Sequence, residues 1–215
     1  MKEIGKLMGS DARVKILRLF LFNEELVCDA DMVADKSRTT LAKARNEIKM
    51  LESIGFLKKK QFTKEVLLKP LKKQKDGRAV KKKATGWQLE KKFPLVAPMQ
   101  KLLLDPELIP TKDLPERLKG MGSIKLLAVS GLFKSDHDRK LDLLIVGEKL
   151  HKTKLEKMVR ILESEIGKEI RYALFDTEEF KYRYEMYDHL IHEVFDYAHD
   201  MIVNKLGIAH KQRRI

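Results

Sequence analysis

Polar and cationic side chains recur along residues 37–54 at spacings that would place them together on one side of a helix. They are Arg38, Thr39, Lys43, Arg45, Asn46 and Lys49. Arginine and lysine can pair with guanine edges or with phosphates, and asparagine can pair with adenine. This combination is what a helix in the major groove of DNA requires. An ordinary solvated helix face is the alternative interpretation of the same residues.

Apolar residues at spacings of three and four predict the helix that would hold these side chains. The residues in question are Leu41, Ala44, Ile48 and Leu51. We expect this helix to begin at Ser37, whose oxygen can accept from free backbone amides of the first turn, and to end at Ile54 before Gly55. Shorter helices are predicted at residues 10–22, capped by Ser10, and at 28–36. Three short helices, the last facing outward, fit a helix-turn-helix core.

A strongly basic stretch follows, because residues 58–83 contain twelve Lys and Arg residues against Glu65 and Asp76. The flanking segments are rich in β-branched and aromatic residues, and Asp76-Gly77 is a turn dipeptide, so a long basic hairpin is predicted. A flexible solvated loop is the alternative. The cations expected to bind phosphate are Lys58, Lys59, Lys60, Lys72, Lys73, Lys75, Arg78, Lys81, Lys82 and Lys83. Each phosphate contact would add roughly 0.9 to the slope of log affinity against log salt.

The succession of two helices, an outward-facing helix and a Gly-Phe-Leu segment leading into the lysine-rich hairpin resembles the winged-helix domain of small prokaryotic transcription regulators. The resemblance covers about residues 8–93, and the winged-helix domain that it implies is placed at residues 1–93. It implies double-stranded DNA as the partner, with the third helix in the major groove and the hairpin, or wing, on the backbone or in the minor groove.

The net charge of the chain supports a polyanionic partner for its first half. The formal charge is +13, and residues 1–104 carry 25 Lys and Arg against 12 Asp and Glu, whereas residues 105–215 carry 20 of each. Such an asymmetry between halves is typical of nucleic-acid binding. A single cysteine, Cys28, leaves no disulfide framework within the chain and fits a reducing compartment. With no apolar leader or membrane-length stretch, a cytoplasmic protein without membrane association is expected.

The second half alternates between strand and helix patterns. Five of the six prolines fall in a connector at residues 94–119, and a small α/β unit is expected at 120–215. Strands are predicted at 124–129, 141–146 and 169–175, with a helix at 149–166 between the last two. The last element of the second domain is predicted to be a long helix from Glu178 to about Leu206. The expected fold class is therefore a two-domain α+β or α/β protein.

Ser130-Gly131 and Asp142, in the run LDLLIVG, resemble the nucleotidyltransferase fold of the polymerase-β superfamily over residues 120–180. That family holds two catalytic metals with a pair of acids in one strand and a third acid in the next. Here Lys140 stands in place of the first acid, Ser130 precedes Gly131, and the third strand offers only Glu169 and Arg171. The resemblance therefore implies a non-catalytic sensor or dimerisation module, with Asp142 as a structural acid that pairs with Lys140 or a nearby amide. The alternative is an active nucleotidyltransferase that uses Asp142 and magnesium.

A weaker expectation concerns ligands of the second domain, for which Ser130, Gly131, Lys134 and Arg139 could bind a nucleotide or phosphate. His192, Asp196 and His199 would share one face of the predicted long helix, but the wet face of an amphipathic helix explains them better than a metal site. No metal or cofactor is expected. Single-strand or RNA binding is disfavoured, because the basic segment has few aromatic rings for base stacking. The winged-helix resemblance, together with the basic first half, thus implies a DNA-binding transcription regulator, for which a homodimer is an expectation because two-fold symmetric sites are common for such modules.

Overall fold

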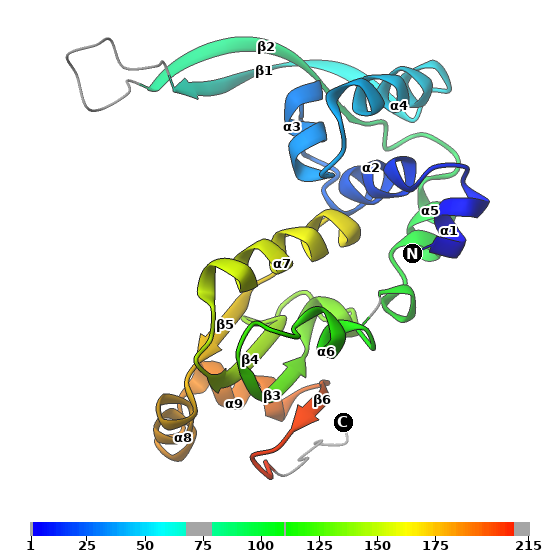
Figure 1. The fold of residues 1–215 in the computed structure, drawn as a ribbon. Helices are drawn as coiled ribbons and strands as arrows, with labels where there is room; N and C mark the ends of the chain where they lie inside the picture. Colours follow the sequence, from blue (N-terminus) through cyan, green and yellow to red (C-terminus); the bar gives the residue numbers. More distant parts are fainter. Residues whose placement is uncertain (1, 68–78, 110, 209–215) are drawn as a thin grey trace, which may run out of the picture. The chain divides into compact units, whose positions relative to one another are not determined.

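The computed structural model describes residues 2–67, 79–109 and 111–208, and it has a mixed α+β fold (Figure 1). The chain divides into two compact units. The first unit is Lys2–Lys101 and the second is Leu102–Ile215. The division falls within the proline-rich segment 94–119.

The first unit begins with four helices: α1 (Lys2–Leu7), α2 (Asp11–Phe22), α3 (Ala30–Lys36) and α4 (Leu41–Ser53). The predicted cap of α2 is confirmed, because the Ser10 side chain accepts a hydrogen bond from the Arg13 amide at 3.2 Å. Asp29 caps α3 in the same way, accepting from the Met32 amide at 3.0 Å. Each cap satisfies an amide that has no partner within its own helix.

The predicted start of α4 at Ser37 is wrong. Ser37 instead ends α3, and its buried hydroxyl donates to the Val33 carbonyl at 2.6 Å. The cap of α4 is Thr40, which accepts from the Lys43 amide at 3.3 Å. Arg38 lies between the two helices with a φ of 47°. This left-handed residue turns the chain sharply, so the segment that looked like the first turn of one long helix is a tight turn between two.

A long antiparallel hairpin follows, formed by β1 (Leu57–Leu67) and β2 (Ala79–Leu89), which Figure 1 shows projecting beyond the helices of its unit. The register runs from Leu57 opposite Leu89 to Leu67 opposite Ala79. The predicted hairpin pairing is therefore present, whereas the predicted Asp76-Gly77 turn lies outside the described residues. At the root of the hairpin, Cys28 pairs with Trp87 through two backbone hydrogen bonds of 3.0 and 2.8 Å.

Gly86 is required at this root because two chain segments approach it closely. A Cβ atom at residue 86 would lie 2.8 Å from both the Cys28 carbonyl oxygen and the Phe62 ring. Beneath it, the apolar faces of the helices and the base of the hairpin form one core, whose buried members include Val14, Leu17, Phe20, Val33, Ala44, Ile48, Leu51, Phe56, Leu57 and Leu89. The helix α5 (Val96–Leu103) follows the hairpin.

The environment of Cys28 gives a first testable prediction. Its side chain is fully buried, and burial raises the pKa of the thiol to about 11. At pH 8 only about 0.1% of such a thiol is ionised, and the thiolate is the reactive form. We therefore expect a thiol reagent to label the native protein far more slowly than the denatured protein. Equal labelling rates in the two states would show that the Cys28–Trp87 pairing opens readily.

The second unit contains a four-stranded sheet in the order β5-β4-β3-β6. Its strands are β3 (Ser123–Val129), β4 (Leu143–Glu148), β5 (Tyr172–Phe175) and β6 (Asp200–Asn204). The parallel pair β4 and β5 is connected by α7 (Lys152–Ile166), and the other pairs are antiparallel. Two short 3-10 helices, Pro106–Leu108 and Gly131–Lys134, and α6 (Leu114–Arg117) complete the connections before β4.

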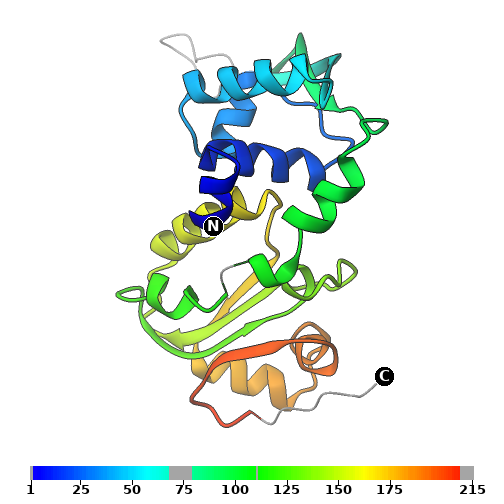
Figure 2. The ribbon, with the colours of Figure 1, turned by 90° about the vertical axis from the view of Figure 1, so that its right-hand side faces the viewer.

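Helices cover both faces of this sheet, as Figure 2 shows. One face packs against α8 (Thr177–Glu185) and α9 (His189–Asp196), and its buried cluster includes Leu126, Leu144, Phe180, Ile191 and Phe195. Because side chains alternate along a strand, Leu127 and Ile145 point to the opposite face, where α7 lies. The predicted strand–strand–helix–strand order is present, although β4, β5 and α7 begin two or three residues later than expected.

The predicted long helix from Glu178 to Leu206 is wrong. The helix ends after α8, where Tyr187 has a φ of 55°. The Asp188 side chain then accepts from the Leu190 amide and caps the start of α9. It then forms β6, which pairs with β3. Apolar residues at helical spacing continue through both helices, so the spacing alone did not reveal the break. The last element of the second unit within the described residues is therefore an edge strand and not a long helix.

Candidate nucleic-acid interface

The outer face of α4 presents the side chains that the sequence singled out. Lys43, Arg45, Asn46 and Lys49 are all exposed. On the opposite side of the helix, Ala44, Ile48 and Leu51 are buried in the core. In the turn before α4, Arg38 is exposed and Thr39 is half-buried. The six predicted helix residues thus lie on α4 or at its start.

Both acidic residues of α4 are paired with cations of neighbouring elements. Glu47 is only 12% exposed and accepts from Arg13 Nε of α2 at 2.8 Å. Glu52 contacts Lys59 of the hairpin at 2.8 Å. The outward face of α4 therefore combines three cations and an amide, and the two carboxylates of the helix are neutralised by Arg13 and Lys59. The sequence pattern did not reveal this, because it depends on partners 34 and 7 residues away in the chain.

The lysines at the root of the hairpin are engaged with neighbours of the same unit. Lys58 contacts Glu90 at 3.1 Å, and Lys60 donates to the Gln88 side chain at 3.0 Å. Lys64, farther out, forms an ion pair with Asp29, the cap of α3. Lys58, Lys59 and Lys60 were predicted to bind phosphate, and in the structure each of them has an intramolecular partner.

The distal part of the described hairpin differs. Lys81, Lys82 and Lys83 on β2 are all exposed. Opposite residues of an antiparallel pair share a face, so Lys83 lies on the same face as Thr63, Gln61 and Lys59, whereas Lys82 lies with Lys64. The predicted phosphate-binding residues Lys72, Lys73, Lys75 and Arg78 lie outside the described residues.

The ion pairs at the hairpin shift the acidities of the groups involved. Hydrogen bonds from Lys59 and then Trp87 lower the pKa of Glu52, and a hydrogen bond from the Lys92 amide and then one from Lys58 lower the pKa of Glu90. Burial alone would raise the pKa of Asp29, but hydrogen bonds from Lys64 and the Met32 amide outweigh it, so this pKa is lowered. The hydrogen bond to Asp29 in turn raises the pKa of Lys64. These carboxylates are ionised at neutral pH and keep their lysine partners.

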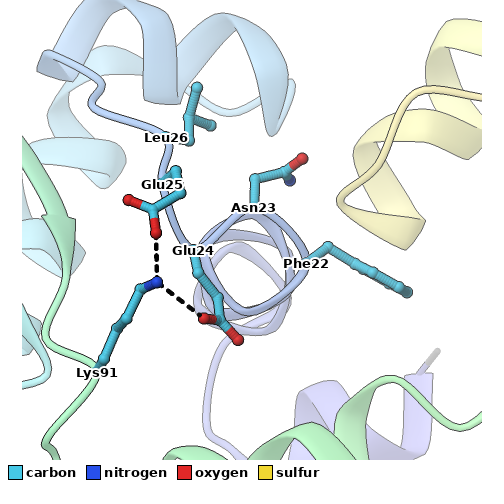
Figure 3. Close-up of a pocket in the computed structure, with 6 residues that line it drawn as sticks. All are labelled: Phe22, Asn23, Glu24, Glu25, Leu26 and Lys91. Atoms are coloured by element: carbon cyan, nitrogen blue, oxygen red, sulfur yellow. Dashed lines mark hydrogen bonds and ion pairs between the residues drawn. The ribbon is translucent and has the colours of Figure 1, made fainter.

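A hollow of about 620 Å³ opens at the end of α2, lined by Phe22, Asn23, Glu24, Glu25, Leu26 and Lys91 (Figure 3). Lys91 points to the two glutamates, forming an ion pair with Glu25 and lying 3.4 Å from a carboxylate oxygen of Glu24. Gln88 and Gln100 also donate to Glu25 and Glu24, at 3.2 and 2.9 Å. The charged side chains that line the hollow pair with one another. These contacts connect the root of the hairpin to the end of α2, and the hollow offers no separate ligand site.

Asp142 in the second unit is 1% exposed and has four hydrogen-bond donors. One carboxylate oxygen accepts from the Leu132 amide and Arg171 Nη2, both at 2.8 Å. The other accepts from the amide and Nε of Arg171, both at 2.9 Å. Asp142 was expected to pair with Lys140 or a nearby amide, and the amides of Leu132 and Arg171 are those partners. The Lys140 amide itself donates to Glu193.

The residues proposed to bind a nucleotide or phosphate have partners within the unit. The buried Ser130 hydroxyl donates to the Leu141 carbonyl at 2.8 Å, and Lys134 forms an ion pair with Asp200. Arg139 contacts Asp136 at 2.9 Å and lies 3.7 Å above the Tyr197 ring. Gly131, with a φ of 48°, lies where a Cβ would collide with the Asp142 carboxylate. These four residues therefore stabilise the loop before β4.

The histidines near the end of the described chain do not share a face. His192 on α9 stacks between Tyr184 and Tyr187, with ring centroids 4.8 Å apart in each pair, whereas His199 lies beyond the end of the helix. Nowhere in residues 2–67, 79–109 and 111–208 do three His, Cys, Asp or Glu side chains form a group that could hold a metal ion. Within the same described ranges, no helix has the length and apolar character to cross a membrane.

Sequence reasoning missed four residues whose contacts hold α3, α4 and the hairpin together: Asp29, Glu47, Glu52 and Trp87. Their roles arise from contacts across the unit, and no local pattern marks them. Comparisons with protein families, curated proteins and solved structures yielded no family model, no curated protein and no structure that matches this chain.

Proposed function

We propose that the chain is a DNA-binding transcription regulator whose first unit is a winged-helix domain, with α4 as the recognition helix and the β1–β2 hairpin as the wing. The observation that carries this proposal is the outer face of α4, where Lys43, Arg45, Asn46 and Lys49 are exposed while both acids of the helix are paired elsewhere. A face of this chemistry suits base edges and phosphates of the major groove.

The order of elements supports the same assignment. In chain order, α2 is followed by Cys28, then by α3 and α4, and then by the β1–β2 hairpin. Trp87 on β2 pairs with Cys28. The recognition helix and the basic hairpin thus belong to one packed unit. Helix-in-groove docking with a basic appendage on the backbone needs this combination, because phosphate contacts set orientation while base contacts set specificity.

Duplex DNA fits this surface better than single-stranded nucleic acid. Proteins that hold single strands usually stack bases on exposed aromatic rings. Among the described residues of the first unit, the exposed large hydrophobic side chains are aliphatic: Leu7, Ile54 and Leu95. Trp87 is half-buried and donates its indole N–H to Glu52 at 3.0 Å, so it is not presented for stacking.

For the second unit we propose a nucleotidyltransferase-like fold kept as a sensor or dimerisation module of a cytoplasmic regulator. The support is the state of Asp142, whose two carboxylate oxygens accept four hydrogen bonds from Leu132 and Arg171. A guanidinium cation thus lies where a catalytic acid of this superfamily would contact its metal. Catalysis by Asp142 would require this pair to separate, so the regulator is the better supported of the two functions.

The test of DNA binding is a salt titration of the full chain with a random-sequence duplex of about 20 base pairs, long enough for two turns. We expect log affinity to fall linearly with log salt. Replacing Lys81, Lys82 and Lys83 with glutamine should reduce the slope by up to about 2.7, because each lost phosphate contact removes about 0.9.

The matched control is Lys152→Gln/Lys154→Gln/Lys157→Gln, which removes the same charge from the exposed side of α7 in the second unit. Its slope should equal that of the wild type. Equal slope losses in the two triple variants would mean that net charge alone governs binding. A wild-type chain that fails to bind duplex at low salt would contradict the proposed function.

A further inference from the structure

We propose that Glu52 is a positioning residue that fixes the angle between the wing and the recognition helix, so that the proximal lysines Lys59 and Lys64 support the wing while the distal lysines contact DNA phosphates. This inference rests on the proposed function, since it concerns how the same surface meets duplex DNA. It assigns a role to one acidic residue within a basic surface, where charge alone would make that residue unfavourable.

The geometry at Glu52 connects three elements. One carboxylate oxygen lies 2.8 Å from Lys59 Nζ, and the other accepts from Trp87 Nε1 at 3.0 Å. Lys59 and Trp87 face each other in the β1–β2 register, so one side chain at the last turn of α4 holds both strands of the wing. We call this set, Glu52, Lys59 and Trp87, the Glu52 bridge.

A second contact acts from the other side of the wing. Lys64 forms an ion pair with Asp29, which also caps α3. Because Lys64 is five residues beyond Lys59 on the same strand, its side chain points to the opposite face of the hairpin. Contacts on opposite faces at two points along the wing oppose rotation in both directions. Single exposed ion pairs contribute little, but here they are joined to a cap and to an indole hydrogen bond.

The wing needs such support because an isolated two-stranded hairpin has little stability of its own. A wing that changed its angle freely would lose conformational entropy whenever Lys81, Lys82 and Lys83 contacted phosphates. Fixing the angle beforehand reduces that loss, which is the usual gain from preorganisation. Lys59 and Lys64 accordingly serve DNA binding through other residues and do not need to touch phosphate.

The experiment uses the sign of the charge change. Glu52→Gln removes a negative charge from a DNA-binding surface, so a purely electrostatic surface would bind duplex more tightly, above all at low salt. The positioning role predicts the reverse. We expect affinity of the full chain for a duplex selected from a random library to fall about threefold to tenfold, with an unchanged salt slope.

Lys59→Gln completes the test because it changes charge in the opposite direction. Both single variants should weaken binding to a similar extent, and the double variant should be little worse than either, since the same bridge is lost in each case. Trp87→Phe removes the indole N–H together with part of the ring volume, and it should weaken binding in the same sense. Circular dichroism of each variant establishes that it is folded.

Asp35→Asn, at an exposed acid on α3, is the control for the charge change of Glu52→Gln. It should leave binding unchanged or make it slightly tighter. If Glu52→Gln behaves like Asp35→Asn, or if Lys59→Gln lowers the salt slope by about 0.9, the positioning role is wrong while DNA binding stands. If wild-type protein shows no salt-dependent duplex binding, the proposed function itself fails.

Discussion

The double replacement Lys43→Ala/Asn46→Ala is expected to abolish the preference of the full chain for a selected duplex over a random one. Both side chains are exposed on the outer face of α4, one turn apart, so they can contact neighbouring base pairs in one groove. A good paired contact to a base edge contributes about 1–3 kcal/mol of discrimination. Losing two should therefore reduce the specificity ratio by at least about thirtyfold.

The measurement compares affinities for a duplex enriched from a randomised library and for a scrambled duplex at one salt concentration. Binding to the scrambled duplex should fall only modestly, because Arg38, Arg45, Lys49 and the distal lysines remain. Lys152→Ala/Thr153→Ala changes two exposed side chains of α7 and should leave both affinities unchanged. An equal loss on both duplexes would instead show that α4 contacts phosphates and not bases.

Asp142→Ala is expected to destabilise the second unit by about 1–3 kcal/mol, the usual cost of leaving buried donors without an acceptor, because Asp142 is buried whereas the Arg171 side chain is 42% exposed and can bind water. The variant leaves the Leu132 and Arg171 amides and the Arg171 guanidinium without their acceptor. Asp142→Asn should also be destabilising, because an amide replaces one accepting oxygen with a donor. Lys140→Ala is the matched control in the same loop and should have little effect on stability.

The single tryptophan makes the measurement selective, because Trp87 lies in the first unit. Denaturant unfolding of the Asp142 variants should shift when followed by far-ultraviolet circular dichroism, while the part of the transition seen by tryptophan fluorescence should stay in place. Undiminished stability of both variants would mean that Asp142 is not a structural acid. Metal-dependent nucleotide transfer that Asp142→Asn abolishes without loss of stability would favour the enzyme alternative.

Periodicity and composition predicted α2, α3, the hairpin and α4 apart from its start, but not α1. The helix over residues 10–22 and its Ser10 cap are confirmed, and the strands of the hairpin were predicted by their β-branched residues on either side of a turn signal. The outward face of α4 follows from the spacing of Ala44, Ile48 and Leu51. These features depend on residues close together in the chain, which is why local patterns were informative.

Contacts between distant residues could not be predicted in the same way. The partner of Asp142 is Arg171, 29 residues later, and the Glu52 bridge joins residues 35 apart. Lys140 was a reasonable partner for Asp142 because the two residues are two positions apart and would share a face of one strand. However, β4 begins only at Leu143, so neither residue belongs to the strand. The short strand β6 was missed because its apolar residues also fit a continued helical pattern.

Glu47 and Glu52 are each paired with a cation, Arg13 and Lys59, so the electric field at α4 has a direction as well as a strength. Positive charge lies on the outer side of this helix, and the charges of these two ion pairs cancel. A polyanion approaching through solution would therefore exert a torque on the first unit and turn the outer face of α4 toward itself before contact. Such alignment increases the fraction of productive collisions, and it weakens as salt shortens the range of the field.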